Sequence, residues 1–151
     1  MSDERKSAEQ MLAETGVFVS TTSGRSMEPM LHDRRDTVVV ERAAARLRRY
    51  DVALYRAGGK LILHRVVRVL PDGYKIRGDH VYDTETVGDG QILGVMTSFT
   101  RRGRPISAQN RRYRAYAAAW TALFPLRLAW HKTHLFCARA WRKVVPKKTE
   151  R

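Results

Sequence analysis

Between residues 17 and 100 the chain alternates short runs of strand-forming residues with turn signals, and this rhythm restricts the fold more than any other feature. The runs are rich in β-branched and aromatic side chains, which favour strands. Gly58-Gly59 and Asp72-Gly73 separate neighbouring runs, and such pairs favour the tight turns of β-hairpins. Because hairpins join antiparallel strands, we predict a mainly β fold built on an antiparallel β domain. The runs cover residues 17–20, 37–41, 52–55, 61–70, 74–77 and 92–99.

Helical patterns flank the β segment on both sides. Residues 2–15 place apolar side chains at helical spacing, and Gly16 follows where a helix would end. From residue 111 to about residue 145 aromatic side chains recur every three or four positions, with arginines between them. Pro125 is expected to divide this stretch into two helices. We therefore predict three segments, namely an N-terminal helical lead over 1–16, the β domain over 17–100 and a basic aromatic helical arm over 101–151.

The net charge of +14 is concentrated in the arm. Residues 101–151 carry 14 Lys or Arg and one acidic residue, whereas residues 1–100 carry 15 basic and 14 acidic residues. A field of this sign attracts anionic lipid, nucleic acid or acidic protein. The aromatic side chains fit packing on the β domain, contact of residues 111–145 with an anionic membrane surface, or stacking on a single nucleic-acid strand. Of these partners, nucleic acid is the one we do not expect.

Several function classes are excluded by what the sequence does not contain. Charged residues are spread through the first ten positions, unlike in a signal peptide. No apolar run approaches the ~20 residues of a membrane-spanning helix, so a cytoplasmic or peripheral membrane location is predicted. The single cysteine, Cys137, cannot form an internal disulfide. The five histidines lack the paired spacing of metal ligands, so neither a metal nor a cofactor is expected.

The first candidate for chemistry is Ser26, in the segment Ser23-Gly-Arg-Ser-Met-Glu-Pro-Met-Leu31. Pro29 fixes its own φ and biases Glu28 away from helix, so the chain turns sharply there. Such a bend exposes a hydroxyl and leaves nearby backbone N–H groups unpaired. These are the requirements of a nucleophile and an oxyanion hole, although a serine before a proline also occurs in ordinary turns.

The second candidate is His64, within the strand-forming run 61–70. Strand alternation puts His64 on one face and Arg65 on the other. A histidine among apolar neighbours is commonly a core residue, yet its ordinary pKa makes it the natural base for a serine at neutral pH. Lys60 lies on the same face as His64 and is the alternative base, but its place beside Gly59 predicts a solvated side chain.

Two aspartates follow the run 74–77 and are candidates to orient the histidine. Asp79 and Asp83 each stand just beyond a predicted strand, where a carboxylate can accept the second ring N–H of His64. Aspartates are also common in turns after glycine. The residues alone do not choose between the two.

Together these segments resemble the motif series of type I signal peptidases over about residues 20–97. Histidine at the position of His64 is typical of the endoplasmic-reticulum and archaeal members, whereas bacterial members carry lysine. The resemblance implies that Ser26 attacks the scissile carbonyl, that His64 takes its proton, and that the Ser26 N–H forms part of the oxyanion hole. The segments, in order, are Ser-Met-Glu-Pro, Asp-Val-Ala-Leu-Tyr, His-Arg-Val-Val, Gly-Asp and Ile-Leu-Gly-Val.

The resemblance also implies an antiparallel β fold of the signal-peptidase type and a substrate class. The family cleaves leader or signal-like peptides after small residues and usually carries a membrane anchor before the serine motif; here a polar lead stands in its place. The family's Gly-Asp-Asn-Asn appears here as Gly78-Asp79-His80-Val81. Its acid lies a few residues beyond Gly-Asp, so spacing favours Asp83 and leaves Asp79 as a rival.

Two other functions are alternatives to a serine endopeptidase. Self-cleaving domains of phage repressors share Ser-Met-x-Pro but pair the serine with lysine and follow a DNA-binding domain, which 20 residues are too few to form. A non-catalytic basic module that binds a membrane surface or nucleic acid would explain the arm, but not the joint occurrence of Ser26, His64 and Gly78-Asp79.

Overall fold

The computed structural model describes residues 7–144, with side chains up to residue 134. The chain forms two compact units, which divide between Thr121 and Ala122. The first unit begins with helix α1 (Ala8–Thr15), capped by the Ser7 side chain and ended by Gly16 in the left-handed region. The part of the predicted N-terminal helix before residue 7 lies outside the described residues.

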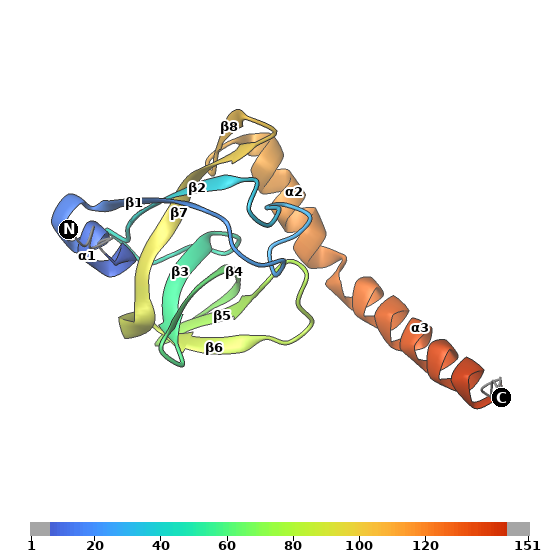
Figure 1. The fold of residues 1–151 in the computed structure, drawn as a ribbon. Helices are drawn as coiled ribbons and strands as arrows, with labels where there is room; N and C mark the ends of the chain where they lie inside the picture. Colours follow the sequence, from blue (N-terminus) through green and yellow to red (C-terminus); the bar gives the residue numbers. More distant parts are fainter. Residues whose placement is uncertain (1–6, 145–151) are drawn as a thin grey trace, which may run out of the picture. The chain divides into compact units, whose positions relative to one another are not determined.

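The centre of the first unit is one curled antiparallel sheet (Figure 1). Its strands pair in the order β1-β2-β7-β3-β4-β5-β6, and β8 pairs with β7. The mainly β, antiparallel fold that the sequence predicts is confirmed. The strands are β1 (Val17–Thr21), β2 (Thr37–Arg42), β3 (Val52–Ala57), β4 (Lys60–Leu70), β5 (Gly73–Arg77), β6 (Glu85–Gly88), β7 (Ile92–Arg101) and β8 (Arg104–Ser107), with a short 3-10 helix η1 (Asp89–Gln91) before β7.

The β3–β4 hairpin turns at the predicted glycine pair. Gly58 and Gly59 have φ values of 55° and 74°, a conformation that suits a two-residue hairpin turn and that side chains with a Cβ rarely adopt. The turn sets the register of the two strands, in which Ala53 lies opposite His64. It therefore fixes which β3 side chains lie beside the candidate base.

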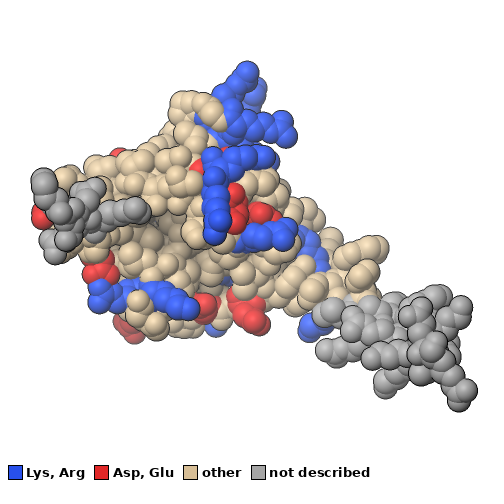
Figure 2. Space-filling model, viewed as in Figure 1, with Lys and Arg blue, Asp and Glu red and all other residues tan. Residues whose placement is uncertain are grey.

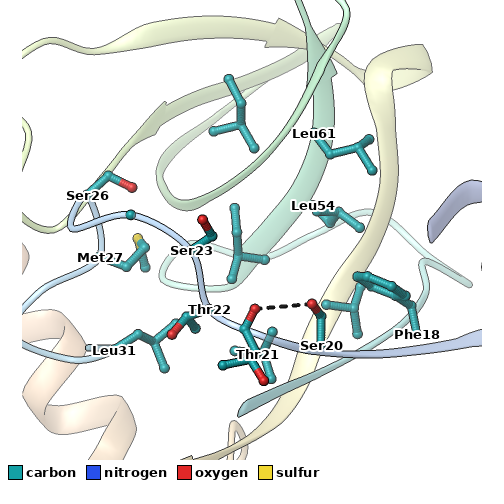
Figure 3. Close-up of a pocket in the computed structure, with 15 residues that line it drawn as sticks. Phe18, Ser20, Thr21, Thr22, Ser23, Ser26, Met27, Leu31, Leu54 and Leu61 are labelled. Carbon is teal, nitrogen blue, oxygen red and sulfur yellow. Dashed lines mark hydrogen bonds between the residues drawn. The ribbon is translucent and has the colours of Figure 1, made fainter. Parts of the chain in front are cut away.

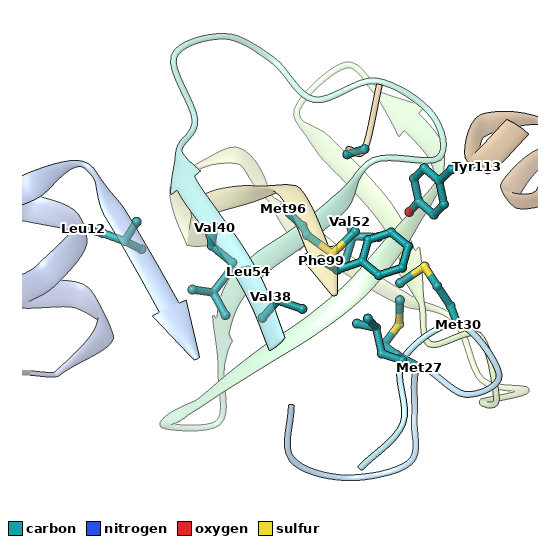
Figure 4. Packing of buried hydrophobic residues seen from close by; sticks show 12 residues of the cluster. Leu12, Met27, Met30, Val38, Val40, Val52, Leu54, Met96, Phe99 and Tyr113 are labelled. Atoms are coloured by element: carbon teal, nitrogen blue, oxygen red, sulfur yellow. The ribbon is translucent and has the colours of Figure 1, made fainter. Parts of the chain in front are cut away.

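Both faces of the central strands are buried, and they support two separate clusters of core side chains. The larger cluster lies between the sheet, the loop that carries Ser26 and the helix α2 (Arg111–Ala122), and includes Met27, Met30 and Tyr113 (Figure 4). The smaller cluster covers the opposite face and includes Tyr55 and Tyr74. Strand β4 contributes to both, because His64 contacts Tyr55 while Arg65 contacts Met30 and Tyr113.

The β unit extends beyond the boundary expected at residue 100. Strand β7 runs to Arg101, and Arg102 and Gly103 turn the chain into β8 with positive φ values. Helix α2 then packs Tyr113 and Ala117 into the first unit. Basic side chains gather over β8 in Figure 2, and Arg102 and Arg104 are exposed there. The positive charge of the expected arm is thus divided between this hairpin and the helices that follow.

The second unit contains α3 (Phe124–Val144). Pro125 stands in its first turn, where the missing N–H costs no hydrogen bond, and the chain is divided there as predicted. Leu123, Leu126 and Trp130 are large apolar side chains that are 47%, 68% and 76% exposed. Among the described residues, no helix has both the length and the apolar character needed to cross a membrane.

Candidate active site

Ser26 lies in the loop between β1 and β2, which several hydrogen bonds hold in place. The His80 N–H donates to the Ser26 carbonyl oxygen at 2.8 Å. The Gly24 N–H donates to Asp33 Oδ1 at 2.8 Å, and the Thr22 hydroxyl donates to the His32 carbonyl at 2.6 Å. The apolar residues just after Ser26 anchor the loop in the larger core cluster. The serine is therefore presented by a fixed loop.

The hydroxyl and the backbone N–H of Ser26 are available to a bound substrate. Within the described part of the chain, neither its hydroxyl nor its backbone N–H makes a hydrogen bond. The residue is half-buried and lines a cavity of the first unit. A free hydroxyl beside a free N–H is what a nucleophile and an oxyanion donor require.

His64 approaches the serine loop across Gly78. A Cβ added to Gly78 would lie 2.6 Å from the Ser26 carbonyl oxygen and 3.0 Å from His64 Nε2. The Ser26 carbonyl oxygen and His64 Nε2 therefore lie no further apart than the sum of these two distances from the Cβ position. Only glycine at residue 78 permits so close an approach of the two segments. The structure thus brings Ser26 and His64, 38 positions apart in the sequence, to one place.

The two ring nitrogens of His64 have different surroundings. Nδ1 lies 3.2 Å from the Tyr55 hydroxyl, which donates to Glu85 Oε2 at 2.8 Å. Among the side chains of residues 7–134, Nε2 has no hydrogen-bond partner, and the Tyr116 hydroxyl is the only buried side-chain nitrogen or oxygen without one. Nε2 therefore retains access to solvent, although the His64 residue is only 7% exposed.

Burial sets the ionisation of this histidine. It lowers the pKa of His64, and the negative charges of Glu85 and Asp79 oppose the effect without reversing it. The imidazole is therefore neutral at pH 7 and can accept a proton. Burial also raises the pKa of Tyr55, and the neighbouring Glu85 carboxylate adds to the shift. The Tyr55 hydroxyl thus keeps its proton at neutral pH.

Asp79, one of the two predicted orienting acids, forms a buried ion pair with Arg65. Arg65 Nε and an Arg65 terminal nitrogen donate to its two carboxylate oxygens at 2.8 Å and 2.7 Å. Arg65 also donates to the Tyr113 hydroxyl, and the Trp120 indole donates to the Asp79 carbonyl. Asp79 therefore ties β4 to α2. In the sequence, Arg65 stands within a strand-forming run, and that pattern does not predict an ion pair with Asp79.

The other predicted residues lie at the surface. Asp83 is exposed, in the segment between β5 and β6. Lys60, the alternative base, is exposed at the first position of β4, beside the hairpin turn, where a solvated side chain is expected. Tyr55 and Glu85 were not among the predicted site residues. They are 30 positions apart; Tyr55 ends the Asp-Val-Ala-Leu-Tyr segment, but the sequence assigns it no role, and Glu85 lies in none of the motif segments.

A cavity of about 370 Å³ opens beside Ser26 (Figure 3). One wall is strand β1, another is the serine loop, and a third is the start of β4. Hydroxyl groups stand along the β1 side, whereas the floor is apolar. The lining side chains include Phe18, Ser20, Thr21, Thr22, Leu31, Val38, Val40, Leu54, Leu61 and Leu63.

No model of a known protein family matches the chain, and no curated protein matches it. Among the described residues, no group of three or more His, Cys, Asp or Glu side chains is placed to hold a metal ion. The chemistry that this part of the chain offers is that of a hydroxyl, an imidazole and backbone amides.

Proposed function

We propose that the protein is a serine endopeptidase in which Ser26 is the nucleophile and His64 the general base. The observation that carries the proposal is the convergence of the Ser26 backbone and His64 Nε2 on Gly78. A neutral, largely buried imidazole with one unpartnered nitrogen beside a serine with a free hydroxyl supports it further. The resemblance of the motif series to type I signal peptidases points to the same chemistry.

The proposed reaction has two halves, as in other serine peptidases. The Ser26 hydroxyl attacks the scissile carbonyl carbon while its proton passes to His64 Nε2. The Ser26 N–H donates to the oxyanion that forms. His64 then returns the proton to the leaving amine, and an acyl-enzyme remains. A water molecule, deprotonated by the same nitrogen, attacks the ester, and collapse of the second tetrahedral intermediate restores Ser26.

The cavity supports an extended peptide as the substrate. Strand β1 is the edge of the sheet, so one side of its backbone is not paired within the sheet and suits an added strand. Its side chains line the cavity together with those of the serine loop. The apolar floor fits apolar side chains ahead of the cut, and the family resemblance suggests small ones next to it. Leader or signal-like peptides have these properties.

The test is cleavage of a peptide library by the purified chain, read by mass spectrometry, with a fluorophosphonate probe as a second readout. We expect cleavage after small residues and labelling at Ser26. Both should be lost in Ser26→Ala and kept in Ser107→Ala, which removes an exposed hydroxyl on β8. Folded protein that cleaves nothing and reacts with the probe no more than Ser26→Ala would exclude the peptidase.

A second function is favoured by exposed apolar side chains in the first turns of α3 and just before it. Leu123, Leu126 and Trp130 follow one another at helical spacing and are mostly exposed, in a basic region of the sequence. Aromatic and aliphatic side chains flanked by cations suit the headgroup boundary of an anionic bilayer. Because Tyr113 and Ala117 of α2 are buried in the first unit, the membrane contact proposed for residues 111–145 narrows to α3.

Vesicle cosedimentation tests this contact. We expect the full chain to bind phosphatidylserine-containing vesicles and not neutral ones. The double substitution Leu126→Asp with Trp130→Asp should weaken binding at least about tenfold, since each large apolar side chain contributes ~1.5–3 kcal/mol when buried. Val69→Asp, at an exposed apolar position of β4, is the matched control. Equal binding of both variants, or binding to RNA that excludes vesicles, would contradict the proposal.

A further inference from the structure

The hydrogen bonds around His64 determine where its ring proton lies. A tyrosine hydroxyl has one proton to donate. Tyr55 donates that proton to Glu85 Oε2, an acceptor at 2.8 Å. The contact of 3.2 Å between the Tyr55 oxygen and His64 Nδ1 is then a hydrogen bond only if Nδ1 carries a proton and the Tyr55 oxygen accepts it. Nε2 is left with its lone pair free, on the side of Gly78 and Ser26.

We propose that Tyr55 and Glu85 are the positioning residues that hold His64 as the Nδ1–H tautomer and so aim Nε2 at Ser26. The inference rests on the proposed function for its catalytic meaning. Serine peptidases with a carboxylate on Nδ1 achieve the same orientation directly. Here a tyrosine hydroxyl stands between the carboxylate and the ring, and the carboxylate comes from Glu85 on β6.

The packing explains why the Glu85 carboxylate acts on His64 through the Tyr55 hydroxyl and not by direct contact. Tyr55 is fully buried in the smaller core cluster, and its ring lies next to that of His64. Glu85 lies at the start of β6, beyond Tyr55. Asp79, the other acid whose charge acts on His64, has both carboxylate oxygens bound by Arg65. Among the described side chains, the titratable groups that act on the imidazole are Tyr55 from β3, by contact, and Glu85 from β6 and Asp79 after β5, by their charge.

The arrangement also assists the proton transfer. When Nε2 accepts the Ser26 proton, the ring becomes cationic and its Nδ1–H donates more strongly to Tyr55. The Tyr55 hydroxyl in turn donates more strongly to the Glu85 carboxylate, which stabilises the positive charge. Glu85 therefore offsets part of the burial that disfavours a charged imidazole. Its removal should lower the proton affinity of the base.

The first experiment reads the tautomer without reference to catalysis. In the full chain labelled with ¹⁵N-histidine, the ring nitrogens of neutral His64 should show a protonated Nδ1 and an unprotonated Nε2. His64→Gln assigns the signals. Tyr55→Phe should raise the fraction of the Nε2–H form. A wild-type His64 protonated at Nε2, or a tautomer ratio unchanged in Tyr55→Phe, would overturn the inference even if the protein proves to be a peptidase.

The second experiment measures activity on a peptide that the wild type cleaves. Tyr55→Phe should lower kcat by about 10- to 1,000-fold with KM little changed, less than the ~10⁴-fold cost of a wrong tautomer in Ser-His-Asp peptidases. Tyr74→Phe is the matched control, because it also removes a buried hydroxyl in the smaller core cluster, one that binds the Leu47 N–H. An equal kcat loss in both variants would reduce Tyr55 to a structural role.

The pH profile of activity distinguishes Glu85 from Asp83 as the acid that acts on His64. In Glu85→Gln the acidic limb of kcat/KM should move to lower pH, because the charge that raises the pKa of His64 is gone. The plateau rate should fall in the same variant. Asp83→Asn is the competing variant. A loss of activity there, with a wild-type profile in Glu85→Gln, would return the orienting role to Asp83. Absence of any wild-type cleavage would instead defeat the proposed function and leave the tautomer measurement standing.

Discussion

His64 and Arg65 are neighbours on β4, yet they face opposite clusters and differ in how completely their polar atoms are satisfied. The Arg65 guanidinium binds Asp79 through two hydrogen bonds and also donates to Tyr113 and to a backbone carbonyl. The His64 ring uses one nitrogen and leaves the other without a partner in the described chain. A buried group whose donors are bound holds the fold together, whereas one with a free lone pair near a hydroxyl is equipped for chemistry.

The largest effect should come from breaking the Arg65–Asp79 pair. Both side chains are almost fully buried, so Arg65→Met would deprive a buried carboxylate of this ion pair. We expect a loss of about 3–5 kcal/mol in the free energy of unfolding, measured with denaturant. Arg114→Met is the control, because its pair with Asp51 is partly solvated and should be worth no more than about 1 kcal/mol. Equal losses would show that burial does not distinguish the two pairs.

Substitution of His64 should have the opposite signature. His64→Gln removes the base, so kcat should fall by about 10²- to 10⁴-fold on a peptide that the wild type cleaves. The unfolding free energy should change far less than in Arg65→Met, since a comparable volume and one hydrogen-bonding group remain. Kinetics and denaturation on the same preparations measure both quantities. A stability loss as large as that of Arg65→Met would mean that His64 is a structural residue.

Gly78 tests the contact between the two segments directly. In Gly78→Ala the new Cβ would collide with the Ser26 carbonyl and press on His64, so the serine loop must shift. We expect a loss of about 1–3 kcal/mol in stability, together with a larger proportional loss of activity. Gly90→Ala is the matched control, because a Cβ there meets nothing within 4 Å. Full activity in Gly78→Ala would show that the serine does not depend on this approach.

The sequence predicts six of the eight strands, all except β6 and β8, because their signals are local. Gly58-Gly59 requires a turn whatever lies around it, and the β-branched runs on either side pair across it. Strand β7 lies where a strand is predicted, but β8 falls in the segment predicted as the helical arm, although Arg102-Gly103 is a turn signal of the same kind. The basic, aromatic composition of residues 101–151 favours a helical arm and does not indicate this turn.

The partners of the candidate base could not be read in the same way. Tyr55 reaches His64 because β3 and β4 pair in one register, and Glu85 joins them because β5 lies between β4 and β6. The β4–β5 register also shifts between Val66 and Arg68. A pattern of residue types does not fix such registers over several strands, so the aspartates nearest in sequence spacing were the natural candidates for the orienting acid.

The smallest expected effect concerns stability against pH, and it separates His64 from the other titratable groups. Burial lowers the pKa of His64 in the folded protein below its unfolded value, so protonation favours unfolding. The stability is greatest above the unfolded pKa of about 6.5, and it decreases as pH falls below that value and through the lower pKa of the folded state. Unfolding of wild type and of His64→Gln at pH 8 and pH 5 should show a steeper decrease for the wild type. Parallel decreases would mean that the ring nitrogen is better solvated than its burial suggests, which would weaken its contrast with Arg65.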